Sequence, residues 1–512
     1  MSGWRKITGF VSRPIDVHII KEVMETHEIC DIYPDSIHVI NEALIFLARG
    51  KQKKVLVVIG EDESTQKFSG KQEASSGISI KVCPLTHQNC AVLRELFPFT
   101  APLAVLKNKA TIGLGDRLGI ATPGHIRAIK GCNVKPVLAQ QSIRELNLTG
   151  RTYEDVLDDV SWAVFQEGYT RGFGADGDHL KKPEEVKMAL DCGFTMITLD
   201  CSEHIDNSIT FLNNEQISEK YNSICGLKRN MYEEIYKNKL FKLKNGQKIS
   251  FDFDELKKIV LIYHEAISFA VGIYNKFIKD YPKALDLEIS IDETLTPTSP
   301  QAHYFFSSEL FRSGVKVASL APKFCGEFQK GIDYIGNTGC FEKEFREHVK
   351  IAEEFGYKIS IHSGSDKFRI FPIAGKHTEG RYHLKTAGTS WLEAVRVVAL
   401  KDPGLYRQIH KYALSVLDEA KKYYYINADT TKVPDVDLLK DNDLPSLMDN
   451  TDVRQVIHIT YGHILKARDS NGEYMFRNRI NNLLYDYEED YCKGLEKHIG
   501  KHLTALGCFT AE

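Results

Sequence analysis

The feature that most constrains this sequence of 512 residues is a rhythm that runs from about residue 110 to residue 400. A short apolar run, a polar or glycine-rich turn and a helical pattern with apolar residues at i, i+3 and i+4 follow one another repeatedly. The eight predicted strands cover 111–114, 134–139, 172–175, 196–200, 284–292, 315–321, 358–362 and 382–386. Eight strand–helix units in series predict an α/β protein with a closed (β/α)8 TIM-type barrel. An open, doubly wound sheet uses the same alternation and is the less favoured alternative.

The regions on either side of this rhythm have different patterns. Residues 1–105 predict an N-terminal α/β extension, with strands over 54–59 and 78–82 and a capped amphipathic helix over 35–47. The predicted barrel spans 106–402 and contains, at about 203–254, a polar insertion that is too long for an ordinary loop. Residues 403–512 predict a C-terminal helical region that covers the barrel or forms a subunit contact.

Composition excludes several classes of function. The 66 Lys and Arg residues oppose 69 Asp and Glu residues, so the formal net charge of −3 gives no electrostatic support for nucleic-acid binding or a polybasic membrane contact. The longest apolar runs, such as 55–59, are far shorter than the roughly 20 residues that span a bilayer. There is no secretory signal pattern, and the eleven cysteines include no CxxC pair, so we expect reduced thiols and a cytoplasmic protein.

Polar side chains gather where the predicted strands end, which is the edge at which (β/α)8 barrels carry their active sites. Asp178 and His179 follow the third predicted strand, Glu293 follows the fifth, and His362 ends the seventh. Imidazoles together with oxygen ligands suit a first-row divalent metal that keeps open positions. One histidine alone would equally well cap its strand by bonding a backbone carbonyl, but two histidines at one mouth favour a metal. Asp178 would then orient a ligand or act as a general base.

Five longer strings carry a family resemblance: FGADGDHLKKPEEV (173–186), TLDCSEHID (198–206), EISIDETLTPTSP (288–300), SLAPKFCGEFQKGIDYIG (319–336) and ISIHSGSDKF (359–368). With these strings in this order, roughly residues 110–510 resemble the bacterial tagaturonate/fructuronate epimerase family. The resemblance implies an isomerase of hexuronate catabolism that interconverts D-tagaturonate and D-fructuronate at C4. It implies a divalent cation (Zn²⁺, Mn²⁺, Co²⁺ or Ni²⁺) and no nicotinamide cofactor. It also implies Asp178 as proton acceptor, Glu293 as proton donor, and His179, Gln329 and His362 as metal ligands.

The chemistry of a 2-keto sugar acid limits how C4 can be inverted. C4 is β to the carbonyl group, so its C–H bond is not activated and direct deprotonation would give an unstabilised carbanion. Retro-aldol cleavage of the C3–C4 bond, rotation of the aldehyde and re-addition avoid that step, and a metal would stabilise the enediolate as a Lewis acid. The substrate carboxylate needs a cationic partner, for which the predicted candidates are Lys323, Lys385, Arg117 and Arg369.

The sequence leaves two other functions open. A metal-dependent aldolase or lyase on keto-sugar acids would use the same metal and base and stop after cleavage. A variant of this alternative is a Schiff-base aldolase that uses Lys323 or Lys385. A non-catalytic sugar-acid-binding barrel is the other alternative, although it needs fewer ionisable residues at strand ends. In each case the expected partner is a small ketouronate or ketohexose, with no nucleic acid and no membrane, and a homo-oligomer stays open.

Overall fold

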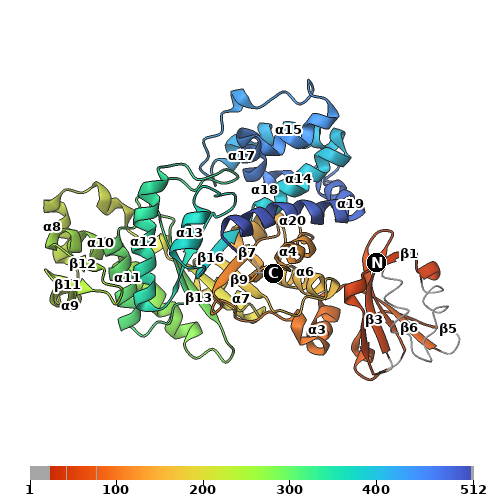
Figure 1. Ribbon diagram of the computed structural model, residues 1–512, viewed down its shortest axis with the longest axis horizontal. Helices are drawn as coiled ribbons and strands as arrows, with labels where there is room; N and C mark the ends of the chain where they lie inside the picture. Colours follow the sequence, from red (N-terminus) through yellow and green to blue (C-terminus); the bar gives the residue numbers. More distant parts are fainter. Residues whose placement is uncertain (1–23, 42, 61, 76–77, 509–512) are drawn as a thin grey trace.

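Eight parallel strands close into a barrel at the centre of the molecule (Figure 1). The structure is a computed structural model that describes residues 24–41, 43–60, 62–75 and 78–508. The order around the barrel is β10-β13-β14-β15-β16-β7-β8-β9, which confirms the predicted (β/α)8 fold. The strands are β7 (Ala110–Leu114), β8 (Lys135–Ser142), β9 (Gly174–Leu180), β10 (Met196–Asp200), β13 (Asp286–Ile291), β14 (Ser319–Pro322), β15 (Lys358–Ile361) and β16 (Tyr382–Thr386).

Helices follow the strands and cover the outside of the barrel, so the strands are buried on both faces. These helices are α4 (Thr122–Ile129), α5 (Ile143–Thr149), α6 (Tyr153–Gln166), α7 (Pro183–Asp191), α10 (Phe253–Ile273), α11 (Pro300–Arg312), α12 (Thr338–Phe355), α13 (Phe371–His377) and α14 (Thr389–Lys401). Each active-site loop therefore leaves a strand held rigidly between the core and a helix.

The third barrel strand, β9, lies later in the chain than the pattern predicts. The pattern predicts a strand end at residue 175, because the segment GADGDHL combines glycine with charged residues and contains no β-branched residue. The strand nevertheless continues through Asp176 and Asp178, because polar groups inside the barrel, including Thr198 and Lys385, bond these carboxylates. As a result, Asp178 and His179 belong to the strand itself.

The N-terminal region is a six-stranded antiparallel sheet beside the barrel, with α3 (His87–Leu96) between them. Its strands are β1 (Ile29–Ile32), β2 (His38–Ile40), β3 (Ala43–Gly50), β4 (Lys54–Ile59), β5 (Lys71–Ser75) and β6 (Ile78–Pro84). The predicted helix over 35–47 is wrong, because this segment forms β2, a turn at Asn41 with a positive φ of 49°, and most of β3. Both faces of β3 are buried, so its sequence lacks the alternation that marks a half-exposed strand.

The polar insertion contains α8 (Asn214–Ser223), α9 (Gly226–Tyr236) and the small hairpin of β11 (Leu240–Lys242) and β12 (Lys248–Ser250). It packs on α10 and α11, at the side of the barrel away from the N-terminal sheet (Figure 1). None of the described helices combines the length and the apolar character needed to cross a membrane.

The C-terminal helices form a second core that packs on α14 and α4 (Figure 1). They are α15 (Pro403–Ser415), α16 (Leu417–Ala420), α17 (Thr451–Ile459), α18 (Tyr461–Lys466), α19 (Arg477–Asp486) and α20 (Glu488–Ala505). The segment between α16 and α17 brings Tyr423, Tyr424 and Tyr425 over the mouth of the barrel, where they line the outer part of the site.

Candidate active site

A buried lysine at the centre of the barrel gathers carboxylates from two other strands. The ammonium nitrogen of Lys385 on β16 lies 2.8 Å from Asp176 Oδ2, 2.6 Å from Asp178 Oδ1 and 3.0 Å from Glu288 Oε1. Burial opposes a charge here, but the three carboxylates raise the pKa of Lys385 well above its ordinary value. A charged and fully partnered ammonium is a poor Schiff-base nucleophile and has little capacity left for a substrate carboxylate.

The two aspartates of β9 have different pKa values, because burial dominates at Asp176 and the neighbouring positive charges dominate at Asp178. Burial and the neighbouring carboxylates Asp178 and Glu288 raise the pKa of Asp176 to about 7, although Lys385 opposes this rise. Burial also opposes ionisation of Asp178, but Lys385 and the two nearby imidazoles lower its pKa to about 2. Asp178 is therefore an ionised carboxylate at neutral pH and is able to accept a proton.

His179 reaches the site because β9 contains a bulge. Gly177 pairs with Ile197 and Leu180 with Leu199, so the segment of β9 between these pairs has one residue more than β10. His179 takes up the irregularity with a positive φ of 53°. Its Nδ1 lies 3.2 Å from Asp200 Oδ2, while Nε2 is directed towards Asp178 Oδ1 at 3.8 Å.

His362 follows β15 and presents a similar arrangement from the other side. Its Nε2–H donates to Glu288 Oε1 at 2.7 Å, and its Nδ1 lies 3.2 Å from Asp292 Oδ1 without forming a hydrogen bond. Burial would lower the pKa of His362, but Asp292 and Glu288 raise it to about 10. The centroids of the His179 and His362 rings are 4.9 Å apart, so the structure brings these two predicted ligands together.

Two contiguous cavities open over this cluster, and a third of about 510 Å³ borders His179, Asp200 and Glu293 on another side. An inner cavity of about 60 Å³ is bordered by Asp178, His179 and Lys385. An outer cavity of about 540 Å³ extends towards the tyrosines of the C-terminal region. Six residues border both spaces, which makes the two cavities contiguous: Arg144, Asp292, Glu293, Lys330, His362 and Ser363.

Glu293 is the second predicted proton-transfer group and lies at the junction of the two cavities. Its side chain is 41% exposed, and one carboxylate oxygen lies 3.5 Å from the ammonium of Lys181. A ligand atom of Glu293 lies within 4.8 Å of ligand atoms of His179 and Asp200. Glu293 therefore borders the same inner cavity as Asp178 while staying accessible to solvent.

The donor set fits a divalent metal ion. Each imidazole is oriented by a carboxylate on one nitrogen, which is the usual arrangement for metal-binding histidines. In both cases the other nitrogen, Nε2 of His179 or Nδ1 of His362, has no hydrogen-bond partner among the described residues and faces a carboxylate. Since Asp292 supplies an oxygen ligand next to His362, the site offers the mixed nitrogen and oxygen ligands of a first-row metal.

The third predicted ligand, Gln329, lies farther out and has other partners. It follows β14 and borders only the outer of the two cavities. Its side-chain oxygen accepts hydrogen bonds from the backbone N–H of Asn427 at 3.0 Å and from Gln455 Nε2 at 2.8 Å. Its side-chain nitrogen donates to Glu327 Oε2 at 2.5 Å. A ligand role for Gln329 requires its side chain to leave these partners and stays a prediction.

The four predicted carboxylate-binding cations differ in position. Arg117 borders the inner cavity, but its guanidinium pairs with Glu145 at 3.1 Å. Lys323 borders the outer cavity and donates to the carbonyl oxygen of Thr294. Arg369 borders neither cavity and donates to the backbone carbonyl of Tyr334 at 3.0 Å. The fourth, Lys385, is the carboxylate-bound lysine described above.

Several functional partners escaped the sequence prediction. Asp200 and Glu288 orient the two imidazoles, Asp292 lies beside His362, and Arg144 and Lys330 line both cavities. A signal for two of them is present in the sequence, since alternation along the fifth strand places Glu288 and Asp292 on one face. Lys330 and Arg144 lie on loops or a short helix, where no periodicity marks the direction of a side chain.

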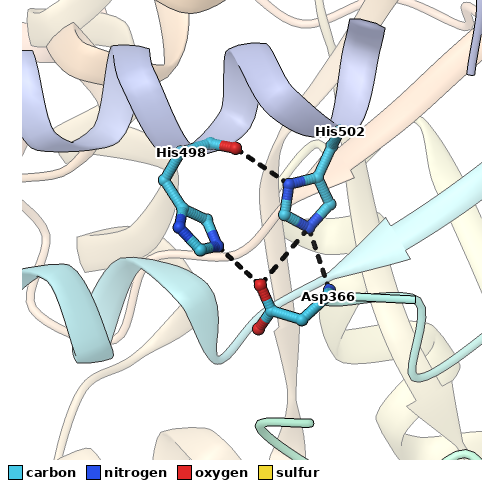
Figure 2. Close-up of side chains that lie close together, drawn as sticks. All are labelled: Asp366, His498 and His502. Carbon is cyan, nitrogen blue, oxygen red and sulfur yellow. Dashed lines mark hydrogen bonds and ion pairs between the residues drawn. The ribbon is translucent and has the colours of Figure 1, made fainter. Parts of the chain in front are cut away.

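A second cluster of histidines and a carboxylate joins the loop after β15 to α20 (Figure 2). Asp366 Oδ1 accepts a hydrogen bond from His498 Nε2 at 2.6 Å, and Arg454 pairs with Asp366 Oδ2 at 2.7 Å. His502 Nε2 accepts the backbone N–H of Asp366 at 2.9 Å, and its Nδ1 donates to the carbonyl oxygen of His498 at 3.0 Å. The lone pair that His502 would offer to a metal is therefore already used.

Comparison with known proteins identifies the family. The model of the tagaturonate epimerase family matches residues 33–506. A tagaturonate/fructuronate epimerase from Thermotoga maritima is 43% identical over 477 residues, which cover 93% of this chain and 97% of that protein. Two crystal structures of a fructuronate-tagaturonate epimerase from Cohnella laeviribosi, one native and one with glycerol, share 48% identity at a TM-score of 0.92 and cover 96% of this chain and 99% of theirs. The chain belongs to the tagaturonate epimerase family of isomerases.

Proposed function

We propose that this protein interconverts D-tagaturonate and D-fructuronate by inverting C4, with a divalent cation bound at the mouth of the barrel. One observation carries the proposal: the centroids of two imidazole rings, one on β9 and one directly after β15, lie 4.9 Å apart. Each ring has one carboxylate-oriented nitrogen and one nitrogen that forms no hydrogen bond with any residue described by the structure. The substrates named for the related proteins from Thermotoga maritima and Cohnella laeviribosi support the choice of ketouronates.

His179 and His362 would hold the cation, with Asp292 as an oxygen ligand and Gln329 as a further ligand if its side chain turns inward. Asp200 and Glu288 keep the two rings in place through the hydrogen-bonded nitrogens. A bound divalent cation supplies Lewis-acid stabilisation of negative charge on substrate oxygens, which is worth several kcal/mol in comparable sites. Since Asp292 and Glu288 raise the pKa of His362, binding of the cation would displace a proton from this ring.

Proton transfer falls to the two carboxylates that border the inner cavity. Asp178, held ionised by Lys385, takes the proton of the C4 hydroxyl group as the C3–C4 bond breaks. The aldehyde fragment rotates in the cavity and presents its other face, and the bond forms again. Glu293, at the solvent-accessible junction of the cavities, donates the proton that the new C4 alkoxide requires.

The direct test is to incubate the purified protein with Mn²⁺ or Zn²⁺ and D-fructuronate, and to separate the ketouronates by chromatography. The proposal predicts a product of unchanged mass that co-migrates with D-tagaturonate, and it predicts that exhaustive chelation abolishes the conversion. Two shorter fragments would instead indicate an aldolase. Full activity after exhaustive chelation would show that the conversion does not require a metal ion.

A further inference from the structure

We propose that Lys330 and Arg144 together bind the carboxylate group of the sugar acid and thereby select an acidic ketose over a neutral one. This inference rests on the proposed function, because it assigns a role within the same site. The sequence predicts four other cations as partners of the substrate carboxylate, and in the structure each of these four side chains binds other groups of the protein.

The cations that border the inner cavity fall into two classes. Arg117 and Lys385 have their charges neutralised by carboxylates at 3.1 Å or less. Lys330 and Arg144 form no ion pair with any residue in the described part of the chain. Glu145 and Glu293 border the same cavity, but neither lies within ion-pair distance of Lys330 or Arg144. Two positive charges placed in this way form a site in which a bound carboxylate gains charge-assisted hydrogen bonds.

Neighbouring groups hold both side chains in place while leaving donors for a ligand. Lys330 Nζ donates a hydrogen bond at 2.9 Å to the Oγ of Ser363, the residue that follows His362 in the chain. The ammonium group has two further protons to donate. The guanidinium of Arg144 stacks on the ring of Tyr424 at 4.9 Å from the centroid, which leaves its N–H edges available. Tyr424 in turn contacts the hydroxyl of Tyr461 at 3.3 Å.

The position of the pair agrees with the dimensions of the substrate. The carboxylate carbon, C6, is separated from the C2 ketone by the full length of the sugar chain. When C2 and C3 lie beside His179 and His362, C6 therefore extends away from the imidazoles towards the outer cavity. Lys330 and Arg144 line both cavities together with His362 and Glu293, so they lie along this path.

The experiment compares D-fructuronate with D-fructose, in which a hydroxymethyl group replaces the carboxylate. We expect Lys330→Gln and Arg144→Gln each to lower kcat/KM for D-fructuronate by about 10- to 100-fold, the range for one hydrogen bond to a charged group. This loss should appear mainly as a higher KM for D-fructuronate. The value of kcat/KM for D-fructose should stay close to that of the wild type. Arg144→Lys, which keeps the charge, should recover part of the loss.

Lys343→Gln is the matched control, because it removes one positive charge from an exposed position on α12 that borders neither cavity. The same comparison is made by calorimetric binding of both sugars, so that it does not depend on turnover. If the wild-type protein binds D-fructuronate more tightly than D-fructose but does not epimerise it, the proposed function is refuted and this inference still stands. The inference would be overturned if the Lys330 and Arg144 variants weakened the binding of both sugars equally, or of neither.

Discussion

Two clusters in this molecule contain the same types of residue and differ in what those residues can do. At the mouth of the barrel, beside an inner cavity, His179 and His362 each keep one nitrogen that has no hydrogen-bond partner within the described ranges of the chain. On the flank of the barrel, Asp366, His498 and His502 satisfy one another and Arg454 (Figure 2). A cavity of about 450 Å³ also borders the flank cluster, so accessible space alone does not separate the two.

The difference shows that lone pairs and orientation decide the function of such a cluster. At the mouth, carboxylates orient the imidazoles from behind, which leaves ligand atoms free for a cation or substrate. On the flank, Asp366 bonds the ligand atoms themselves, His498 Nε2 through its carboxylate and His502 Nε2 through its backbone N–H. Together with Arg454, these bonds tie a barrel loop to α17 and α20. We therefore expect changes at the mouth to affect chemistry and changes on the flank to affect stability.

The largest effect is expected for the proton-transfer groups at the mouth. Asp178→Asn or Glu293→Gln should lower kcat by about 10²–10⁴-fold, because each removes a positioned acid or base. Metal content, measured by mass spectrometry of the protein after dialysis, should stay close to that of the wild type for Glu293→Gln. Wild-type rates in both variants would contradict the assignment of the two roles.

The next effect concerns the ligands. His179→Ala and His362→Ala should lose the bound metal and lower kcat/KM by roughly 10²–10³-fold, comparable to the loss of one transition-state-stabilising group. Circular dichroism should show that both variants stay folded. His502→Ala on the flank is the comparison and should keep the metal. Stoichiometric metal in both of these variants would show that His179 and His362 are not metal ligands.

The flank cluster should respond in stability. Asp366→Asn leaves the buried Arg454 and His498 without their carboxylate, and breaking a buried pair in this way costs about 3–5 kcal/mol of unfolding free energy. Asp449→Asn, which removes an exposed partner of Arg396, should cost about 1 kcal/mol or less. Urea denaturation measures both. Equal destabilisation by the two substitutions would show that burial of the flank cluster carries no extra stability.

The smallest effect is expected for the pH dependence of the difference in unfolding free energy between the wild type and Asp366→Asn. Burial opposes ionisation of Asp366, but His498 and Arg454 lower its pKa in the folded protein below the ordinary 3.8. The unfolded chain therefore takes up a proton at higher pH than the folded chain. The stability advantage of the wild type over Asp366→Asn should be complete above the ordinary value and should shrink as the pH falls below it. An advantage that grows with acidity in urea titrations would reverse this assignment.

Much of the barrel could be predicted from the sequence, because its strands are short apolar runs buried on both faces and followed by amphipathic helices. Asp178, His179 and His362 could be placed at strand ends for the same reason. The bulge that turns His179 inward could not be predicted, since it depends on the pairing of β9 with β10. The contact between Lys385 and Asp178 joins residues 207 positions apart and exists only once the barrel closes.

The N-terminal region shows the opposite case. A strand buried on both faces, β3, has no alternating pattern, and its apolar residues also satisfy helical spacing. Only its partners β1, β2 and β4 make it a strand. Periodicity therefore succeeded in the barrel and at the predicted strands 54–59 and 78–82, which are β4 and β6 of the same antiparallel sheet. It failed at β3, where helical spacing and a strand buried on both faces give the same apolar pattern.

The most direct test of the account is anomalous diffraction from crystals of the protein soaked in Mn²⁺ after removal of metals. We expect one strong peak between His179 and His362, within bonding distance of both imidazoles, and no peak beside Asp366 and His498. A peak at the flank cluster, or none at the mouth, would contradict the assignment of the metal site and with it the proposed mechanism.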